Sequence, residues 1–321
     1  MKTGALIIPT GIGASIGGYA GDASKWARKL AKKCKLIVNP NVVNAACFSG
    51  ISENMLYVEG YTMSEFFKGN CSLIPSENNR IGVVFDKAIP QDILNIHINT
   101  INAVKTVYDI DIVGYEITKK NVGVNYFLDS SGASVGNIEC IDTIKHASCK
   151  LLSKGASAIA IVCLFPDDEL NEYYKNGIGV DPVGGMEAII SHYISKELKI
   201  PTAHAPAFLD TSINSEIVNP KCAAEYITPT FLPCILLGLA NAPLISDYRN
   251  GINVDDIDFL VVPYNALGGI PILEMSKRKK KIYAIKENST ALNVTNDVLH
   301  KNSNIIYVDT YKECLDLIIE N

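Results

Sequence analysis

The chain has 321 residues, 48% of them apolar, which is enough for one large hydrophobic core or two of medium size. Its net charge is −5, and its Lys and Arg residues form no stripe, which argues against nucleic acid as a partner. The nine cysteines show no CxxC pair and no spacing typical of a metal site. We therefore expect no metal, and we interpret the cysteines as reduced thiols of a cytoplasmic protein.

The amino terminus does not have the pattern of a signal peptide. Lys2 precedes an apolar run, but that run breaks at Pro9 and Gly11, which makes it too short for the apolar core of a leader. No apolar stretch of the sequence reaches the length needed to span a bilayer. We expect a small-molecule ligand and no membrane partner.

Short apolar runs that end in Pro, Gly or polar residues alternate with longer mixed segments along the chain. The predicted strands cover residues 6–9, 35–38, 55–60, 81–86, 111–118, 158–163, 200–206, 259–263, 282–286 and 305–308. The predicted helices cover 23–33, 91–109, 139–154, 186–198 and 222–240, with one more after 263 and one at the end. This alternation predicts an α/β fold, a doubly wound and mostly parallel sheet or sheets with helices on both faces.

The sequence marks no clear domain boundary, because no low-complexity linker divides it. We predict a single α/β unit over residues 1–321 and keep open a division into two lobes, Rossmann-like halves, near 120–140, in a Gly/Ser-rich stretch. In the helix predicted at 222–240, Pro229 and Pro233 should produce a kink. Its apolar second half is typical of core, and a homo-oligomer interface is the alternative.

A glycine cluster directly after the first strand is the main candidate for a binding loop. Glycines at a strand–helix junction let the backbone turn sharply and approach a ligand, and the helix start offers N–H groups to an anion. We therefore expect this loop to bind an anionic group through Gly11, Gly13, Gly17 and Gly18. The alternative is that the glycines only permit close packing of helix and strand.

The loop does not match the known nucleotide-binding patterns. Ile16 stands where the third glycine of the dinucleotide fingerprint should be, and Asn39 and Asn41 stand where an acidic residue is expected. No Lys-Ser/Thr pair follows the glycines, which excludes a P-loop. Since 260–263 also ends in Pro before Gly268 and Gly269, two similar loops could face one crevice; chance similarity is the alternative.

A second candidate loop precedes the helix predicted at 186–198. Gly184 and Gly185 form a possible anion cradle at the start of this helix, with Glu187 in its first turn and His192 further on. Asp181 is a binding candidate or simply the cap of the helix.

The third candidate is His204, among small residues at the end of a predicted strand. A histidine in a cleft titrates near neutrality and is the first choice for general acid/base catalysis. A core histidine bonded to a backbone carbonyl is the alternative.

Other polar side chains also follow predicted strands. Asn39, Asn41 and Asn44 could bond hydroxyl or carboxylate groups of a ligand. Glu59, Glu287 and Asn288 occupy similar strand-end positions, where they bind sugar hydroxyls or act as a base, or else cap the next turn.

Several of these segments resemble a known family, the domain of unknown function 3326. The similar segments are 8–23, 39–44, 57–61, 181–187, 204–208 and 267–269. The family has cyanobacterial, plant and other bacterial members, some labelled as related to lipid-A-disaccharide synthase. The resemblance implies that these loops are family motifs, and it implies no reaction.

Taken together, the loops predict a small-molecule enzyme. We expect an anionic metabolite with a carboxylate or phosphate, and metal-free acid/base chemistry such as isomerisation, elimination or group transfer. The residues expected to transfer protons and orient the substrate are Asp22, Glu59, Glu187 and His204. Two other classes stay open: a nucleotide-dependent enzyme, either an NAD(P) oxidoreductase or a nucleotide-sugar transferase, and a non-catalytic ligand-binding protein.

Overall fold

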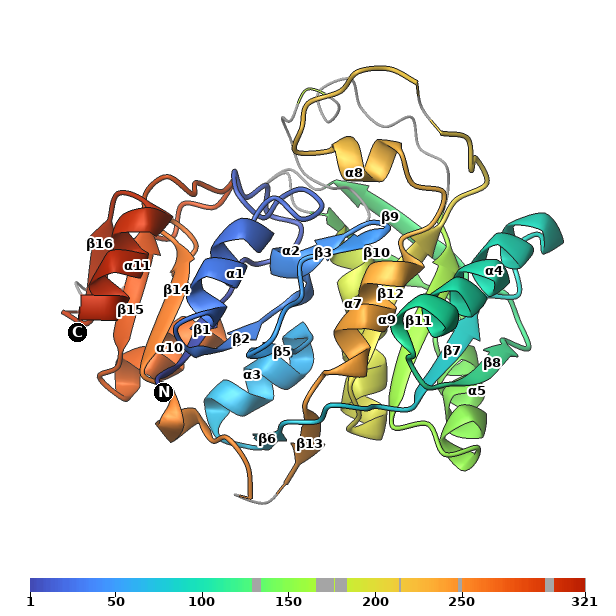
Figure 1. Cartoon of the computed structure of the whole chain (residues 1–321), viewed down its shortest axis with the longest axis horizontal. Helices are drawn as coiled ribbons and strands as arrows, with labels where there is room; N and C mark the ends of the chain where they lie inside the picture. Colours follow the sequence, from blue (N-terminus) through green and yellow to red (C-terminus); the bar gives the residue numbers. More distant parts are fainter. Residues whose placement is uncertain are drawn as a thin grey trace.

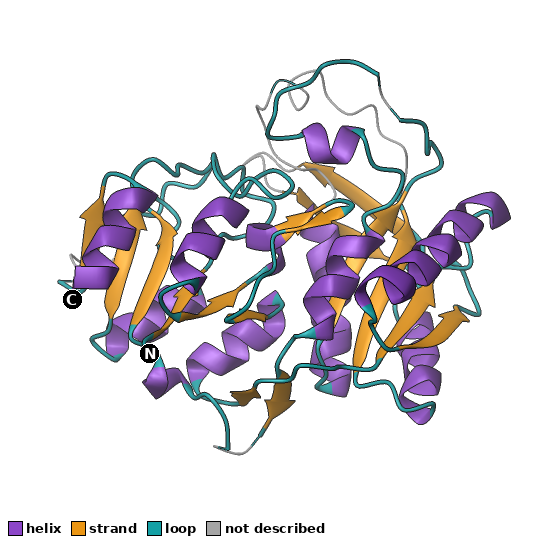
Figure 2. Cartoon of the chain, in the orientation of Figure 1, coloured by secondary structure: helices purple, strands orange, loops and turns teal. Residues whose placement is uncertain are grey.

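The fold consists of two parallel β-sheets, each covered by helices on both faces (Figures 1 and 2). The computed structural model describes residues 1–128, 134–165, 176, 184–213, 215–247, 250–297 and 303–320. The α/β class and the helices on both faces of mostly parallel sheets are confirmed.

The first sheet has the order β16-β15-β14-β1-β2-β5, and all its pairs are parallel. Its strands are β1 (Thr3–Leu6), β2 (Lys35–Val38), β5 (Met55–Tyr57), β14 (Phe259–Pro263), β15 (Lys281–Ile285) and β16 (Ile305–Val308). Neighbouring side chains of β1 point to opposite faces, so Leu6 packs in one core and Ala5 in another. This is why these strands read as continuous apolar runs.

Because both faces of the first sheet are buried, helices pack against both of them. One face carries α1 (Ser24–Ala31) and α11 (Tyr311–Glu320), and the other carries α3 (Gly60–Lys68) and α10 (Ile270–Lys277). β1, the first strand of the chain, pairs with β14 from the last third of the chain, and Gly4 lies opposite Phe259. A Cβ on Gly4 would lie 2.2 Å from the ring of Phe259, so only glycine fits there.

The second sheet has the order β12-β11-β7-β8 and is also parallel. Its strands are β7 (Ile81–Phe85), β8 (Ile112–Ile117), β11 (Ala158–Leu164) and β12 (Thr202–Ala207). One face packs on α4 (Gln91–Tyr108) and α9 (Leu232–Ala240), and the other on α5 (Asp142–Ser153) and α7 (Gly184–Leu198).

Smaller elements complete the described part of the chain. They are α2 (Pro40–Val43), β3 (Asn44–Ala45), β4 (Phe48–Ser49), β6 (Ser72–Ile74), β9 (Val124–Leu128), β10 (Ser134–Ile138), α8 (Ala223–Tyr226), β13 (Leu244–Ser246) and a 3-10 turn, Val254–Asp256. In the Gly/Ser-rich stretch at 121–137 lie β9 and most of β10, which pair antiparallel. The helix predicted at 222–240 is instead two helices, α8 and α9, and Pro233 lies in the first turn of α9, where proline is tolerated.

The chain passes from the first sheet to the second after β6 and returns after α9. The two passages run side by side, because β6 and β13 pair antiparallel, with Leu244 opposite Ile74. Asn79 joins them: its side chain donates to the carbonyls of Leu239 and Ala242, at 2.8 and 2.7 Å. The single unit with a possible division near 120–140 stays a prediction.

Candidate functional site

A cavity of about 1040 Å³ lies between the two sheets. The first sheet contributes the segments that follow β1, β2 and β5, and the second contributes α7, β12 and α9. The sequence order of the first sheet reverses at β1, whose neighbours are β2 and β14. Open α/β sheets bind ligands at such a switch point, beyond the carboxyl ends of the strands.

Many of the predicted site residues line this cavity, and they come from distant parts of the chain. They are Gly18, Asn39, Asn41, Asn44, Glu59, His192, His204 and Gly269. The cavity therefore brings predicted residues of the first sheet close to predicted residues of the second.

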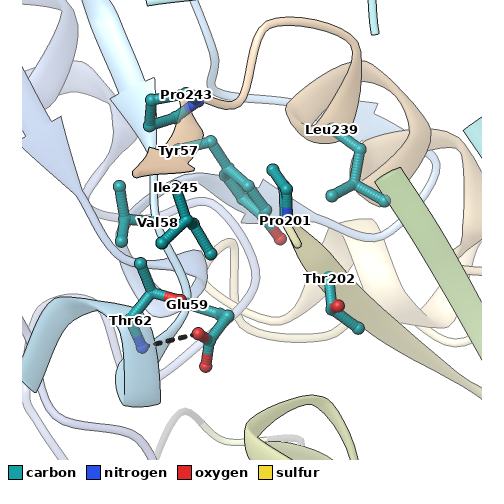
Figure 3. Close-up of a pocket in the computed structure, with 9 residues that line it drawn as sticks. All are labelled: Tyr57, Val58, Glu59, Thr62, Pro201, Thr202, Leu239, Pro243 and Ile245. Atoms are coloured by element: carbon teal, nitrogen blue, oxygen red, sulfur yellow. Dashed lines mark hydrogen bonds between the residues drawn. The ribbon is translucent and has the colours of Figure 1, made fainter. Parts of the chain in front are cut away.

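Glu59 lies at the floor of the cavity, where β5 leads into α3. It is the N-cap of α3: its Oε1 accepts the N–H of Thr62 at 2.6 Å and its Oε2 accepts that of Tyr61 at 2.7 Å. Behind it, a void of about 10 Å³, enough for one water, separates it from Pro201 and Ile245 (Figure 3). Glu59 is only 3% exposed, so its carboxylate is held in a fixed orientation.

His192 faces Glu59 from the opposite sheet. Its Nε2 lies 3.7 Å from Oε2 of Glu59, and its side chain is 42% exposed. A Cβ on Gly60 would lie 2.3 Å from this Nε2, so the imidazole occupies the space that a larger residue at position 60 would need. Burial lowers the pKa of His192, while the carboxylate of Glu59 acts in the opposite direction.

His204 lies on β12, next to the helix that carries His192. Its Nδ1 is 2.8 Å from the hydroxyl of Ser191, which donates to the carbonyl of Ala188 at 3.2 Å. Burial lowers the pKa of His204 to about 3, and His192 adds to this effect. His204 is therefore neutral at physiological pH, so it does not titrate near neutrality as the sequence pattern suggested.

The three asparagines that follow β2 differ in what they offer a ligand. Both polar groups of Asn39 bond the backbone of Ile8, at 3.0 and 2.8 Å, which leaves it a structural role. Asn41 donates to the carbonyls of Ile8 and Pro9. Asn44 accepts the hydroxyl of Tyr57 at 3.1 Å. Within the described residues, Oδ1 of Asn41 and Nδ2 of Asn44 have no partner, so these two atoms can meet a ligand.

Several N–H groups of the glycine-rich loop donate to partners within the protein. The N–H of Ile16 donates to Asn288, that of Gly17 to Asp22 and that of Ala20 to Glu225. Of the four predicted glycines, only Gly18 lines the cavity; Gly11, Gly13 and Gly17 have positive φ and serve the turns of the loop. Of the four predicted glycines, Gly17 is the one whose N–H is used in these contacts, so an anion cradle at this position stays a prediction.

Asp22, Glu287 and Asn288 lie away from the cavity lining and support this loop. Asn288 is fully buried and bonds Ile16 N–H, Ile16 C=O and the Tyr311 hydroxyl. Glu287 accepts the N–H of Tyr311 at the start of α11. Burial raises the pKa of Asp22 to about 6.

The remaining predicted residues belong to the α7 and α10 loops. Gly184, Gly185 and Glu187 lie at the start of α7, and Asp181 lies outside the described residues. Gly269 is the N-cap of α10 and lines the cavity, whereas Gly268 packs near Val294.

Sequence reasoning missed two groups of lining residues. One is Ser191, whose position beside His192 was the available signal. The other is the segment between β12 and α9, residues 208–213 and 215–231, which we call the arm. The arm supplies Phe208, Asp210, Glu225, Tyr226 and Phe231 to the wall, and no sequence periodicity marks it.

Two features of the described residues bear on the type of site. No group of three or more His, Cys, Asp or Glu side chains in that part of the chain has a geometry that could hold a metal ion. Among the same residues, no helix has the length and apolar character required to cross a membrane.

Comparison with known proteins identifies relatives but no activity. An "uncharacterized lipoprotein" of Synechococcus sp. is 38% identical over 300 residues, which cover 91% of this chain and 83% of the relative. No solved structure matches the chain. The family described as "Protein of unknown function (DUF3326)" matches residues 3–321. The chain therefore belongs to this family of proteins of unknown function.

Proposed function

We propose that the protein is an enzyme that performs acid/base chemistry on a small molecule bound between its two sheets. The observation that carries the proposal is the pairing of His192 with Glu59 at the floor of a large cavity, 3.7 Å apart. A ligand in this cavity would meet side chains from both sheets, which is typical of enzyme sites at domain interfaces.

In this proposal His192 accepts a proton from the substrate and Glu59 stabilises the imidazolium that forms. Because burial lowers its pKa, His192 is unprotonated at neutral pH and ready to act as a base. The two backbone N–H bonds to Glu59 keep the carboxylate beside the ring. Neutral His204, fixed by Ser191, orients the substrate by hydrogen bonding.

The chemistry of the wall favours a neutral or positively charged polar group in the ligand. Carboxylates of Glu59, Asp210 and Glu225 line the cavity. The amide atoms of Asn41 and Asn44 that have no partner among the described residues suit hydroxyl or carbonyl groups. An anionic metabolite stays a prediction from the glycine pattern, and these carboxylates do not support it.

The test is conversion of a metabolite from a cell extract, followed by mass spectrometry without prior choice of substrate. The wild type should deplete one compound and form another, and His192→Gln should lose at least about 100-fold in rate, the usual contribution of a positioned base. His146→Gln, on the exposed side of α5, is the matched control and should keep full activity. Equal conversion by His192→Gln would refute the assigned base.

Two other functions from the sequence remain as alternatives. A non-catalytic ligand-binding protein would be stabilised by a compound in the extract without converting it. A nucleotide-dependent enzyme would be stabilised by NAD(P)H, ATP or a nucleotide sugar. A homo-oligomer also stays a prediction.

We further propose that the protein works in the cytoplasm. None of the nine cysteines, all of which lie within the described residues, forms a disulfide bond, which suits a reducing compartment. The word lipoprotein belongs to the name of the cyanobacterial relative. Fractionation of the native host's cells should recover the protein with cytoplasmic markers, and recovery with the membranes would refute this location.

A further inference from the structure

The arm brings carboxylates and aromatic rings to the same wall of the cavity. It leaves β12, carries α8 and continues to α9 (Figure 1). Asp210 lies close to Phe208 in the chain, and both line the cavity. Glu225 directly precedes Tyr226, and these two line it as well. The rings of Phe208 and Phe231 meet edge to face, with centroids 6.3 Å apart. This wall therefore offers negative charge and flat apolar surface together.

Cationic side chains do not balance these carboxylates. Among the described residues that line the cavity there is no Lys or Arg, whereas Glu59, Asp210 and Glu225 all belong to the lining. Lys221 is part of the arm, but its ammonium group donates to the carbonyl of Ser15 at 2.6 Å and it is not a lining residue. A carboxylate or phosphate of a ligand would be repelled by this wall, and an ammonium group would be attracted to it.

The aromatic rings suit both an ammonium group and the apolar body that carries it. The face of an aromatic ring attracts a cation, and flat apolar groups stack against rings. Phe208, Tyr226 and Phe231 are partly exposed, so each has surface that a ligand can cover. The cavity, at about 1040 Å³, has room for a ring system as well as for a head group.

We infer that the ligand of this cavity is an arylalkylamine, a protonated amine carried by a flat apolar ring system. The amine lies toward the carboxylates of the arm, and the ring lies against Phe208 and Phe231. This inference rests on the proposed function only for the position of the ligand. The side chain of His192 is 42% exposed, so the site is open to a ligand from solvent.

The test is the equilibrium binding of three compounds that share an indole ring and differ in charge. They are tryptamine, tryptophol and indolepropionate, which are cationic, neutral and anionic at neutral pH. Isothermal titration calorimetry on the full-length protein measures each affinity. Tryptamine should bind about tenfold more tightly than tryptophol, and indolepropionate more weakly than tryptophol, because the carboxylates attract the first and repel the last. Ethylamine has the charge without the ring and should bind at least about tenfold more weakly than tryptamine.

Two variants with matched controls locate the binding. Asp210→Asn keeps an acceptor for the N–H of Ser212 and should weaken tryptamine about threefold without changing tryptophol. Phe208→Leu removes the ring but keeps an apolar side chain, and it should weaken both compounds about fivefold. The controls are Asp316→Asn on α11 and Phe48→Leu on β4, two exposed positions outside the cavity lining, and both should bind as the wild type does.

Several results would overturn the inference. One is equal affinity for the three indole compounds, or binding of none of them; another is that indolepropionate binds most tightly. Ethylamine binding as tightly as tryptamine, or either arm variant binding like its control, would also overturn it. The test of His192 is separate, because calorimetry here measures binding without conversion. A failed indole series together with a rate loss in His192→Gln would remove the ligand class and keep the assigned base.

Discussion

At the scale of single residues, Asp22 is an acid whose side chain is largely buried, which disfavours its charged form. Its Oδ1 accepts the N–H of Gly17, while its Oδ2 is buried without a hydrogen-bond partner among the described residues. Burial raises its pKa to about 6, from 3.8. The folded protein therefore binds this proton more tightly than the unfolded chain, and the resulting stability, present at low pH, is lost as the pH rises through about 6.

Asp22→Asn should remove this pH dependence, because the amide oxygen can still accept from Gly17 and carries no charge. Between pH 4.5 and pH 7.5, the free energy of unfolding of the variant should rise relative to the wild type by about 1–2 kcal/mol. Urea unfolding at both pH values measures this difference. Asp316→Asn, at an exposed site on α11, should change neither value. A difference that is constant with pH would contradict the buried charge.

Polar residues at strand ends could be recognised in the sequence, but their roles could not. The strand-end positions of Glu59, Asn41 and His204 were visible as polar residues after apolar runs, and all three line the cavity. The same reasoning selected Asn288, which is buried among Ile16 and Tyr311. A strand end fixes which edge of a sheet a side chain approaches, but the partners that occupy its polar atoms come from distant segments.

At the scale of elements, strands were more predictable than irregular segments. The strand at 35–38 was predicted at the bounds of β2, because a strand buried on both faces is a continuous apolar run. The helix predicted at 222–240 failed at residues 227–231, where the chain leaves α8 and continues to α9. Most apolar residues of 228–240 line the cavity or pack in the core. Apolar composition alone does not distinguish such residues from the buried face of one long helix.

Element α3 shows why a predicted catalytic acid can have two roles. Glu59 caps this helix with both oxygens and also faces His192. From the sequence alone, capping and chemistry were alternative roles for Glu59. In the structure, the bonds that satisfy the helix terminus are the ones that hold the carboxylate beside the imidazole.

At the scale of the whole molecule, Asn79 connects the two passages between the sheets. It is 2% exposed, and its amide supplies hydrogen bonds to the carbonyls of Leu239 and Ala242. Asn79→Ala would leave both carbonyls without this donor and should lower the free energy of unfolding by about 2–3 kcal/mol. Thermal or urea unfolding measures this loss.

The control for this variant is Asn102→Ala on the exposed side of α4, where the change should be within about 0.5 kcal/mol. Equal stability of the two variants would mean that the two passages do not depend on Asn79. This joint could not be predicted, since nothing in the sequence indicated that residues near 79 and 240 meet.

The pairing of β1 with β14 has a consequence for how the protein is made. All four strands of the second sheet lie between residues 81 and 207, so that sheet can be completed while the ribosome is still translating the rest. β1 has β2 on one side early, but its other edge waits until Phe259 leaves the exit tunnel. During that interval an apolar strand edge is open to wrong partners, and this is the stage of biosynthesis at which a chaperone would help the nascent chain most.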